Sequence, residues 1–217
     1  MSATKSDEAL YGHLSDADRY IHESRDAAFL GLLKRKGFAS LAGVRVIELG
    51  CGDGTLIRSL AHYGADLSLV AGVEINLERV SSAHAAYSPA RIAAGDASHL
   101  PYRDASFDLA LAFTSFSSMT NAAVRARAAT EALRVLRPGG LLVVYDFRLN
   151  PTNPATQPLP ESDLRGLFGR REIAIERVTL APPIVRALGG RPALCRPLER
   201  VPWLRTHLLS AISKESQ

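Results

Sequence analysis

The sequence predicts an α/β fold in which a doubly wound, parallel sheet carries helices on both faces. Short apolar runs alternate along the chain with stretches of helical periodicity, which is the pattern of successive βαβ units. These runs are apolar at nearly every position, as expected of parallel strands buried on both faces. The length of 217 residues, 47% of them hydrophobic, suits one domain with a sizeable core.

The N-terminal part predicts one long helix and the first strand. Ser15 can cap a helix over residues 16–36, where apolar side chains recur at helical spacing until Gly37 ends it. We expect residues 1–14, which are polar and mixed in charge, to be loosely ordered. They lack the apolar stretch of a secretory signal, which favours a cytoplasmic protein. The β-branched run at 44–49 predicts a buried strand.

The following stretch alternates between the two kinds of element. Helical spacing resumes at residues 55–62, and a second apolar run at 69–75 predicts the next strand. Asn76 can cap a helix over residues 77–87. A short third strand is expected at 91–94.

The middle of the chain predicts two further strands with a helix between them. An apolar run spans residues 107–113, and Asn121 can cap a helix over residues 122–136. The tetrapeptide Arg137-Pro138-Gly139-Gly140 predicts a sharp break, because proline and glycine interrupt regular structure. A fifth strand is expected at 141–147.

The C-terminal third is less regular. Four prolines predict a loop at 150–160, and a short helix at 161–168 precedes a sixth strand at 172–180. Residues 181–202 are rich in Pro, Gly and Arg and predict short helical pieces at most. The pattern at 206–213 fits either an amphipathic helix or a last strand.

The segment after the first strand predicts a ligand-binding loop. It reads Glu48-Leu49-Gly50-Cys51-Gly52-Asp53-Gly54 and leads into a helix. Glycines allow a tight turn and a close approach of the backbone to a ligand. The nicotinamide-dinucleotide fingerprint requires G-x-G-x-x-G/A, but here Thr55 occupies the last position. The acids Glu48 and Asp53 favour a cationic ligand over a diphosphate, which indicates S-adenosylmethionine (SAM) with its positive sulfonium.

Two acids further along the chain fit the same ligand. Glu74 closes the second strand, where a carboxylate can accept hydrogen bonds from both ribose hydroxyls. Dinucleotide enzymes place an acid similarly, so Glu74 alone does not discriminate. Asp96, in Gly95-Asp96-Ala97 after the third strand, can accept a hydrogen bond from an adenine amine.

Four motifs in order resemble the class I SAM-dependent methyltransferases, in particular the small-molecule branch related to ubiquinone and menaquinone methylases. They are VIELGCGDGT, GVEIN, AAGDASHLPYRDASFDLALAF and ALRVLRPGGLLVVYDF, and they cover residues 44–147. The resemblance implies a Rossmann-like, seven-stranded sheet in the order 3-2-1-4-5-7-6 with the last strand antiparallel. It therefore implies that residues 206–213 are the seventh strand.

The resemblance also implies roles for individual residues. Glu48, Gly50, Gly52 and Gly54 would surround the methionine part of SAM, and Phe113 would place backbone against its amino-acid tail. Glu74 would hold the ribose and Ile75 would pack on the adenine. Asp96 and Ala97 would contact the adenine edge. After the fourth strand the chain reads Phe113-Thr114-Ser115-Phe116 instead of Asn-Pro-Pro-Tyr, which argues against a DNA adenine or protein glutamine acceptor.

The sequence shows no unmistakable catalytic base. Tyr145 and Asp146 end the fifth strand at the carboxyl edge, where ligands of such sheets bind. The N-terminal segment of this family often folds over the SAM site, and here it offers Tyr11, Tyr20, His22 and Arg25. We therefore hold Tyr145, Asp146 and His22 as candidates and leave the catalytic residue unassigned. Much of methyl transfer can be achieved by positioning, and a base is needed only if the acceptor must lose a proton.

Charge and composition bear on the partners. From Arg177 onward the chain has seven basic and two acidic residues, whereas the net charge of the whole chain is +4. A basic surface attracts anionic partners. We therefore expect a small-molecule acceptor, anionic or lipid-linked, that is methylated at oxygen as a biosynthetic intermediate, with S-adenosyl-L-homocysteine as the second product. Histidine and cysteine spacing indicates no metal.

Other readings stay open. A basic C-terminus also allows RNA or protein as acceptor. However, no nucleic-acid-binding module is visible, and we expect no nucleic acid as a partner. A non-catalytic SAM-binding protein is a further alternative, as is a peripheral membrane contact, and the chain is a monomer or a homodimer. We expect one domain: a helical cap at 1–40, a SAM-binding core at 44–180, a lid at 181–204 and the final strand at 205–213.

Overall fold

The computed structural model describes residues 15–150, 153, 155–169 and 171–215 and shows a three-layered α/β fold. Residues 1–14, for which we expected loose order, lie outside the described part. The sheet strands are β1 (Val46–Leu49), β2 (Val70–Glu74), β3 (Arg91–Ala94), β4 (Phe107–Phe113), β5 (Leu136–Phe147), β6 (Ile173–Leu180) and β7 (Arg205–Ser213). Their order in space is β3-β2-β1-β4-β5-β7-β6. Since β7 pairs antiparallel with both β5 and β6, the implied strand order and the strand nature of residues 206–213 are confirmed.

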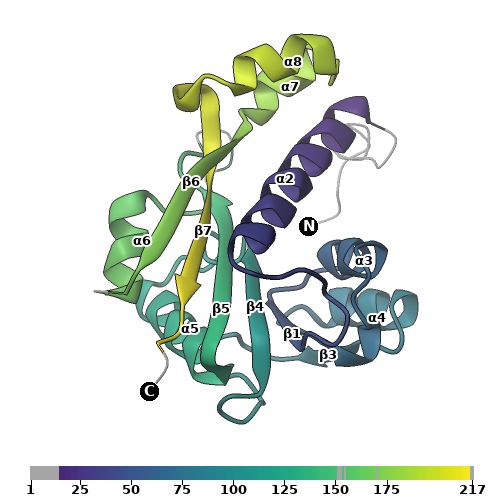
Figure 1. Ribbon diagram of the computed structural model, residues 1–217, viewed down its shortest axis with the longest axis vertical. Coiled ribbons are helices and arrows are strands. Elements are labelled where there is room, and N and C mark those ends of the chain that lie inside the picture. Colours follow the sequence, from purple (N-terminus) through teal and green to yellow (C-terminus); the bar gives the residue numbers. More distant parts are fainter. Residues whose placement is uncertain (1–14, 151–152, 154, 170, 216–217) are drawn as a thin grey trace.

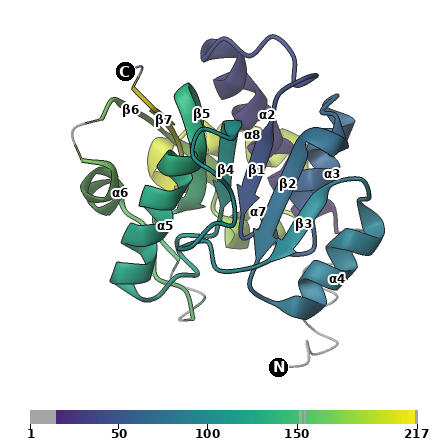
Figure 2. The same ribbon diagram turned by 90° about the horizontal axis from the view of Figure 1, so that it is seen from below.

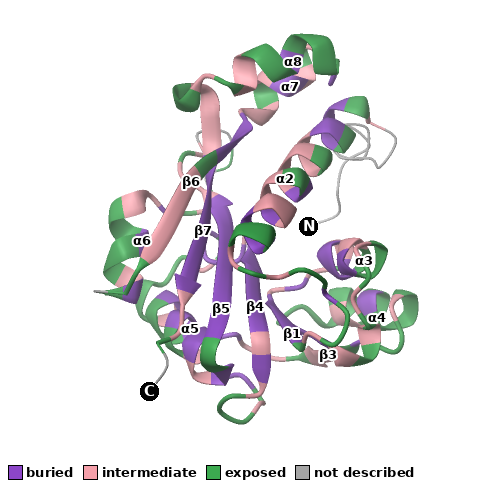
Figure 3. Ribbon diagram, viewed as in Figure 1, coloured by how far each residue is buried: buried purple, intermediate pink, exposed green. Residues whose placement is uncertain are grey.

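Helices cover both faces of the sheet (Figures 1 and 2). The helices are α2 (Asp16–Arg35), α3 (Thr55–His62), α4 (Leu77–Ala86), α5 (Ala122–Val135) and α6 (Glu161–Phe168). Apolar side chains of α2 and α3 fill one core against the sheet, and those of α5 and α6 fill the other. The central strands are buried along nearly their whole length (Figure 3), which explains their continuous apolar sequence.

The predicted break at 137–140, between a helix ending at 136 and a strand beginning at 141, is wrong, because residues 137–140 belong to β5. The strand β5 begins at Leu136, which pairs with Phe107 of β4, and the pairing resumes at Leu141 opposite Leu109. The residues between them bulge out of the sheet, which shifts the register. Gly139 donates a backbone hydrogen bond to Lys214, and the Lys214 N–H donates one to Gly140. The glycines therefore form an excursion within one strand that is held by the end of β7.

The strands β6 and β7 extend past the end of β5 and carry a helical tip (Figure 1). We call the segment 181–204 the tip; it comprises α7 (Pro182–Ala187), α8 (Pro192–Glu199) and the 3-10 turn η2 (Pro202–Leu204). A small separate core made by Ala17, Tyr20, Leu180, Val185 and Cys195 joins the tip to the start of α2. The short helical pieces predicted here are confirmed, but their packing on α2 was not foreseen. No helix among the described residues is long and apolar enough to cross a membrane.

Candidate functional site

The loop between β1 and α3 adopts a conformation that its glycines make possible. Gly50, Gly52 and Gly54 all have positive φ angles, of 69°, 56° and 84°. A Cβ on Gly50 would lie 2.9 Å from the hydroxyl oxygen of Ser115, and one on Gly54 would lie 2.5 Å from the ring of Tyr87. The loop is therefore pressed against its neighbours on two sides, while Gly52 meets only a guanidinium nitrogen at 3.7 Å.

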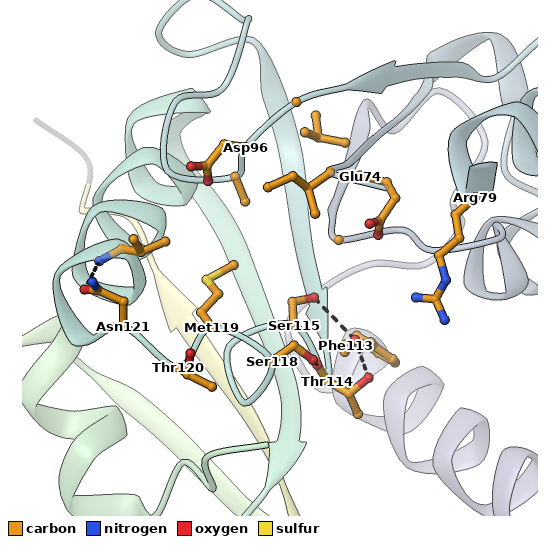
Figure 4. A pocket seen from close by; sticks show the side chains of 16 residues that line it. Glu74, Arg79, Asp96, Phe113, Thr114, Ser115, Ser118, Met119, Thr120 and Asn121 are labelled. Carbon is orange, nitrogen blue, oxygen red and sulfur yellow. Dashed lines mark hydrogen bonds between the residues drawn. The ribbon is translucent and has the colours of Figure 1, made fainter. Parts of the chain in front are cut away.

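Glu74 ties this loop to the end of β2. One carboxylate oxygen accepts a hydrogen bond from the backbone N–H of Gly52 at 3.0 Å, and the other accepts one from Asn76 at 2.9 Å. The side chain is largely buried, so these two bonds hold it in place. Carboxylate oxygens can each accept further bonds, and Figure 4 shows this group facing the adjoining cavity.

Ile75 and Asp96 lie next along the same edge. Ile75 is 74% exposed, an unusual state for a large aliphatic side chain beside a cavity. Asp96 accepts a hydrogen bond from the backbone N–H of Ser98 at 2.8 Å, and this bond holds the pKa of its carboxyl below the usual value. One carboxylate oxygen of Asp96 is thus occupied, and the group is ionised at neutral pH and ready to accept a hydrogen bond from a ligand.

These residues surround a cavity of about 470 Å³ at the carboxyl edge of the sheet (Figure 4). It lies between the ends of β1 and β4, where the strand order changes direction, which is the ligand position expected of doubly wound sheets. Its lining comprises Gly50, Val73, Glu74, Ile75, Arg79, Gly95, Asp96, Ala97, Phe113, Thr114, Ser115, Ser118, Met119, Thr120, Asn121 and Val124. Of the predicted cofactor residues, Gly50, Glu74, Ile75, Asp96, Ala97 and Phe113 line it.

The remaining predicted cofactor residues lie behind the lining. Gly52 and Gly54 shape the loop, and Glu48 is buried in β1. Within the described part of the chain, one carboxylate oxygen of Glu48 has no hydrogen-bond partner. Burial raises the pKa of this carboxyl well above its usual value, and the nearby charge of Arg25 opposes that shift. A positively charged ligand group would stabilise its ionised form.

Sequence reasoning missed the far wall of the cavity, the segment from Ser115 to Asn121. This segment follows β4, and hydrogen bonds to two buried side chains hold it in position. The backbone N–H of Ser117 donates to Asp146 at 3.0 Å, and the guanidinium of Arg125 donates to the carbonyl of Met119 at 3.0 Å. Its place directly after a strand at the carboxyl edge was the available signal.

The candidate bases Tyr145 and Asp146 lie outside the cavity lining. The Tyr145 hydroxyl shares a hydrogen bond with that of Thr179 at 2.9 Å, and burial raises its pKa. Asp146 is 1% exposed and its oxygens accept backbone hydrogen bonds from Ser117 and Phe147. Burial raises the pKa of Asp146 as well. Its contacts position the loop after β4.

The third candidate, His22, lies on α2 and also stands apart from the cavity lining. Its neighbour Tyr20 donates a hydrogen bond to Glu199 at 2.7 Å and so joins α2 to the tip. Arg25 lies deeper: it pairs with Asp26 at 2.7 Å, and its guanidinium carbon lies 5.7 Å from the ring centre of Phe113. Tyr11 belongs to the part that the structure does not describe.

Comparisons with known proteins agree with this geometry. Residues 47–144 match a family model described as a methyltransferase domain. The chain is 33% identical over 149 residues to demethylmenaquinone methyltransferase of Beutenbergia cavernae, covering 66% of this chain and 60% of that protein. It is 36% identical over 117 residues to 27-O-demethylrifamycin SV methyltransferase of Amycolatopsis mediterranei, covering 51% and 41%. The matches therefore span about half the length of these curated relatives.

Solved structures share the fold at lower identity. A SAM-dependent methyltransferase from Mesorhizobium loti superposes with a TM-score of 0.61 at 21% identity, covering 87% of this chain and 99% of that one. The [4+2]-cyclase SpnF superposes with a TM-score of 0.64 at 22% identity, covering 88% and 82%. Since the same fold serves a cyclase, the fold alone does not assign a reaction.

Proposed function

We propose that this chain, whose residues 47–144 match a methyltransferase-domain model, transfers a methyl group from SAM to a small-molecule acceptor. The observation that carries the proposal is the cavity beside the glycine loop. There an anchored carboxylate, an exposed aliphatic side chain and a second carboxylate follow one another along the ends of β2 and β3. This sequence of groups suits a ribose followed by an adenine.

The residues present fit SAM. In this proposal Glu74 accepts from the ribose hydroxyls, Ile75 covers one face of the adenine, and Asp96 accepts from its amine. The loop Gly50–Gly54 contacts the methionine part, and the unpartnered oxygen of Glu48 supplies negative charge behind it. When bound there, SAM supplies a methyl group activated by a positive sulfonium. The protein residues bind, orient and exclude water.

The acceptor chemistry follows from what lines the cavity. Among the residues that the structure describes, the ionisable side chains in the lining are Glu74, Arg79 and Asp96, and none of them is a histidine. The carboxylates of Glu74 and Asp96 already accept backbone hydrogen bonds and are assigned to SAM in this proposal, so neither is a general base for the acceptor. An acceptor that ionises readily, such as an acidic hydroxyl, needs the least help from a base, and positioning then supplies much of the rate. We therefore propose methylation at oxygen.

The relatives favour a small acceptor. Their printed names include demethylmenaquinone and 27-O-demethylrifamycin SV, which are small molecules rather than RNA or protein. We propose an acceptor of this general size, with anionic or lipid-linked character to match the basic C-terminal region.

Two measurements test the proposal. Calorimetric titration with SAM should show binding, and Glu74→Gln should weaken it about 10- to 100-fold, the loss expected for charge-assisted hydrogen bonds. Glu172→Gln, an exposed change just before β6 and outside the cavity lining, is the matched control. Absence of SAM binding by the folded wild type would refute the cofactor assignment.

The second measurement incubates the protein with methyl-labelled SAM and a fractionated lysate of the source cell. Label in the small-molecule or lipid fraction, together with S-adenosyl-L-homocysteine, is the expected result. Label in RNA or protein would overturn the acceptor class and keep the reaction. SAM binding without transfer into any fraction would favour a binding protein.

A further inference from the structure

The outer surface of the tip combines exposed apolar and basic side chains. Trp203 is 76% exposed and Leu194 is 46% exposed, although both are large hydrophobic residues. Trp203 is also the single tryptophan of the chain. Leu194 lies on α8 and Trp203 in η2, and large apolar side chains exposed within one small region mark an interaction surface more often than isolated ones do.

The periodicity of α8 explains why these side chains face outward. Cys195 is fully buried, and Leu198 and Glu199 turn inward as well, toward the core shared with α2. Leu194 and Pro197, three residues apart, lie on the opposite face and are exposed. The tip is thus anchored through one side of α8 and presents the other, as the exposed outer turns of Figure 3 show.

Basic residues predominate on the tip. Arg191, Arg196 and Arg200 are exposed. Within residues 181–204 the only acid is Glu199, and it accepts hydrogen bonds from Tyr20 and Ser24 of α2. The tip therefore carries no further acid that offsets the three arginines, of which Arg196 also borders a hollow shared with Glu23 of α2.

We propose that the tip docks on an anionic lipid surface, with Trp203 and Leu194 entering the headgroup region and the three arginines contacting lipid phosphates. A tryptophan has an apolar body and a polar N–H and suits the boundary between water and hydrocarbon. Each arginine near an anionic bilayer strengthens binding. Apolar contact and charge together make the reversible, peripheral attachment expected of such a surface.

The location of the tip gives this docking a use. The strands β6 and β7 carry it beyond the carboxyl end of β5 (Figure 1), so it lies toward the same edge of the sheet as the residues that line the cavity. A docked protein would therefore meet a lipid-linked acceptor at the membrane surface. The docking itself requires neither SAM nor methyl transfer, so it can fail or succeed independently of the proposed function.

The single tryptophan makes a direct test possible on the full, unaltered chain. Its fluorescence is recorded while vesicles of phosphatidylcholine containing phosphatidylglycerol are added, and again with phosphatidylcholine alone. We expect a blue shift and reduced acrylamide quenching with the anionic vesicles only. An unchanged spectrum with anionic vesicles, or an equal shift with neutral ones, would overturn the proposal.

Variants separate specific docking from general charge. The triple variant Arg191→Gln, Arg196→Gln, Arg200→Gln should bind anionic vesicles about 100-fold more weakly in co-sedimentation, because about 1 kcal/mol per arginine corresponds to about fivefold each. The matched control Lys34→Gln, Arg58→Gln, Arg103→Gln removes the same charge from exposed positions elsewhere and should lose far less. An equal loss in both would refute a role of the tip.

Trp203→Ser completes the series, since it removes an exposed ring and leaves the packed side of the tip intact. We expect it to weaken vesicle binding about tenfold, the loss expected when a large buried apolar group is removed from the interface. If the tip variants instead lose retention of RNA while none of the proteins pellets with vesicles, the surface is a nucleic-acid site and the membrane proposal is wrong.

Discussion

At the residue scale, the loop glycines differ in what surrounds them, and this difference predicts distinct mutational effects. Gly52→Ala adds a methyl group that makes only an ordinary contact with the Arg79 guanidinium at 3.7 Å, and it should cost about 1 kcal/mol of unfolding free energy through its positive φ. Gly54→Ala adds one 2.5 Å from the ring of Tyr87, and strain plus overpacking should cost about 3 kcal/mol. Urea unfolding measures both.

The same pair separates stability from ligand binding. Because we propose that the loop Gly50–Gly54 contacts SAM, and the N–H of Gly52 donates to Glu74, a methyl group on Gly52 should weaken SAM binding well beyond what the small loss of stability explains. A Gly52→Ala protein that is as unstable as Gly54→Ala would contradict the local geometry. One that binds SAM as the wild type does would contradict a close approach of ligand to this residue.

His207 predicts a pH-dependent stability. It is buried and stacked on Tyr145, with ring centres 4.8 Å apart, and burial, aided by the charge of Arg25, lowers its pKa from 6.5 to about 3. Between these values the unfolded chain binds a proton that the folded chain does not. Stability therefore falls as the pH falls through this window, by about 2 kcal/mol from this group between pH 7 and pH 5.

The variant His207→Gln removes the titrating ring and isolates this contribution. We compare the slopes of unfolding free energy against pH for the two proteins, since the absolute stability of the variant also changes. The wild type should lose about 2 kcal/mol more than the variant between pH 7 and pH 5. Parallel slopes would show that the folded protein admits a proton on His207.

At the element scale, caps and periodicity predicted most boundaries. Ser15, Asn76 and Asn121 accept hydrogen bonds from backbone N–H groups in the first turn of their helices, as the sequence indicated. The break at 137–140 was misplaced because proline and glycine signal a departure from regular pairing without saying whether the strand resumes. Here the partner that restores it, Lys214, lies far away in the sequence.

The turn between α7 and α8 lies against the start of α2, and this contact leads to a prediction about the position of α2. Gly189 and Gly190 both have positive φ, but a Cβ on Gly189 meets nothing within 4 Å. One on Gly190 would lie 2.3 Å from the carbonyl oxygen of Asp16. Gly189→Ala should therefore cost about 1 kcal/mol, whereas Gly190→Ala should displace the start of α2 from the tip.

Limited trypsin digestion reads out that displacement, because Arg19 and Arg25 are cleavage sites within α2. We expect faster cleavage there in Gly190→Ala than in Gly189→Ala, with the sheet core still resistant. Equal digestion of the two variants would show that α2 keeps its place without the close contact at this turn.

At the scale of the whole molecule, the half of the site formed by consecutive strand ends could be predicted and the other half could not. The loop Gly50–Gly54 follows β1, Glu74 ends β2 and Asp96 lies two residues after β3, so the parallel topology alone brings them to one edge. The far wall depends on Arg125 and Asp146, which hold the segment after β4 through tertiary contacts. Such contacts leave no periodic signal in a single sequence.

The separation of the tip from the sheet core leads to a last prediction, which tests the expectation that residues 181–204 form a lid. No residue of this segment lines the cavity, and its two ends, Leu180 and Arg205, pair across β6 and β7. A two-residue Asn-Gly turn can therefore replace it. Removal uncovers Ala17 and Tyr20, which pack against the tip, so α2 should loosen and stability should fall while the sheet and cavity remain.

If the tip and α2 together form the acceptor side of the site, this shortened protein should bind SAM with unchanged affinity. It should transfer methyl groups about 100-fold more slowly or worse, because the acceptor is no longer oriented. Calorimetry and the labelled-SAM assay measure the two quantities on the same preparation. Loss of SAM binding by a protein that still unfolds cooperatively would mean that the tip supports the cofactor site itself, and the separation of the two functions would be wrong.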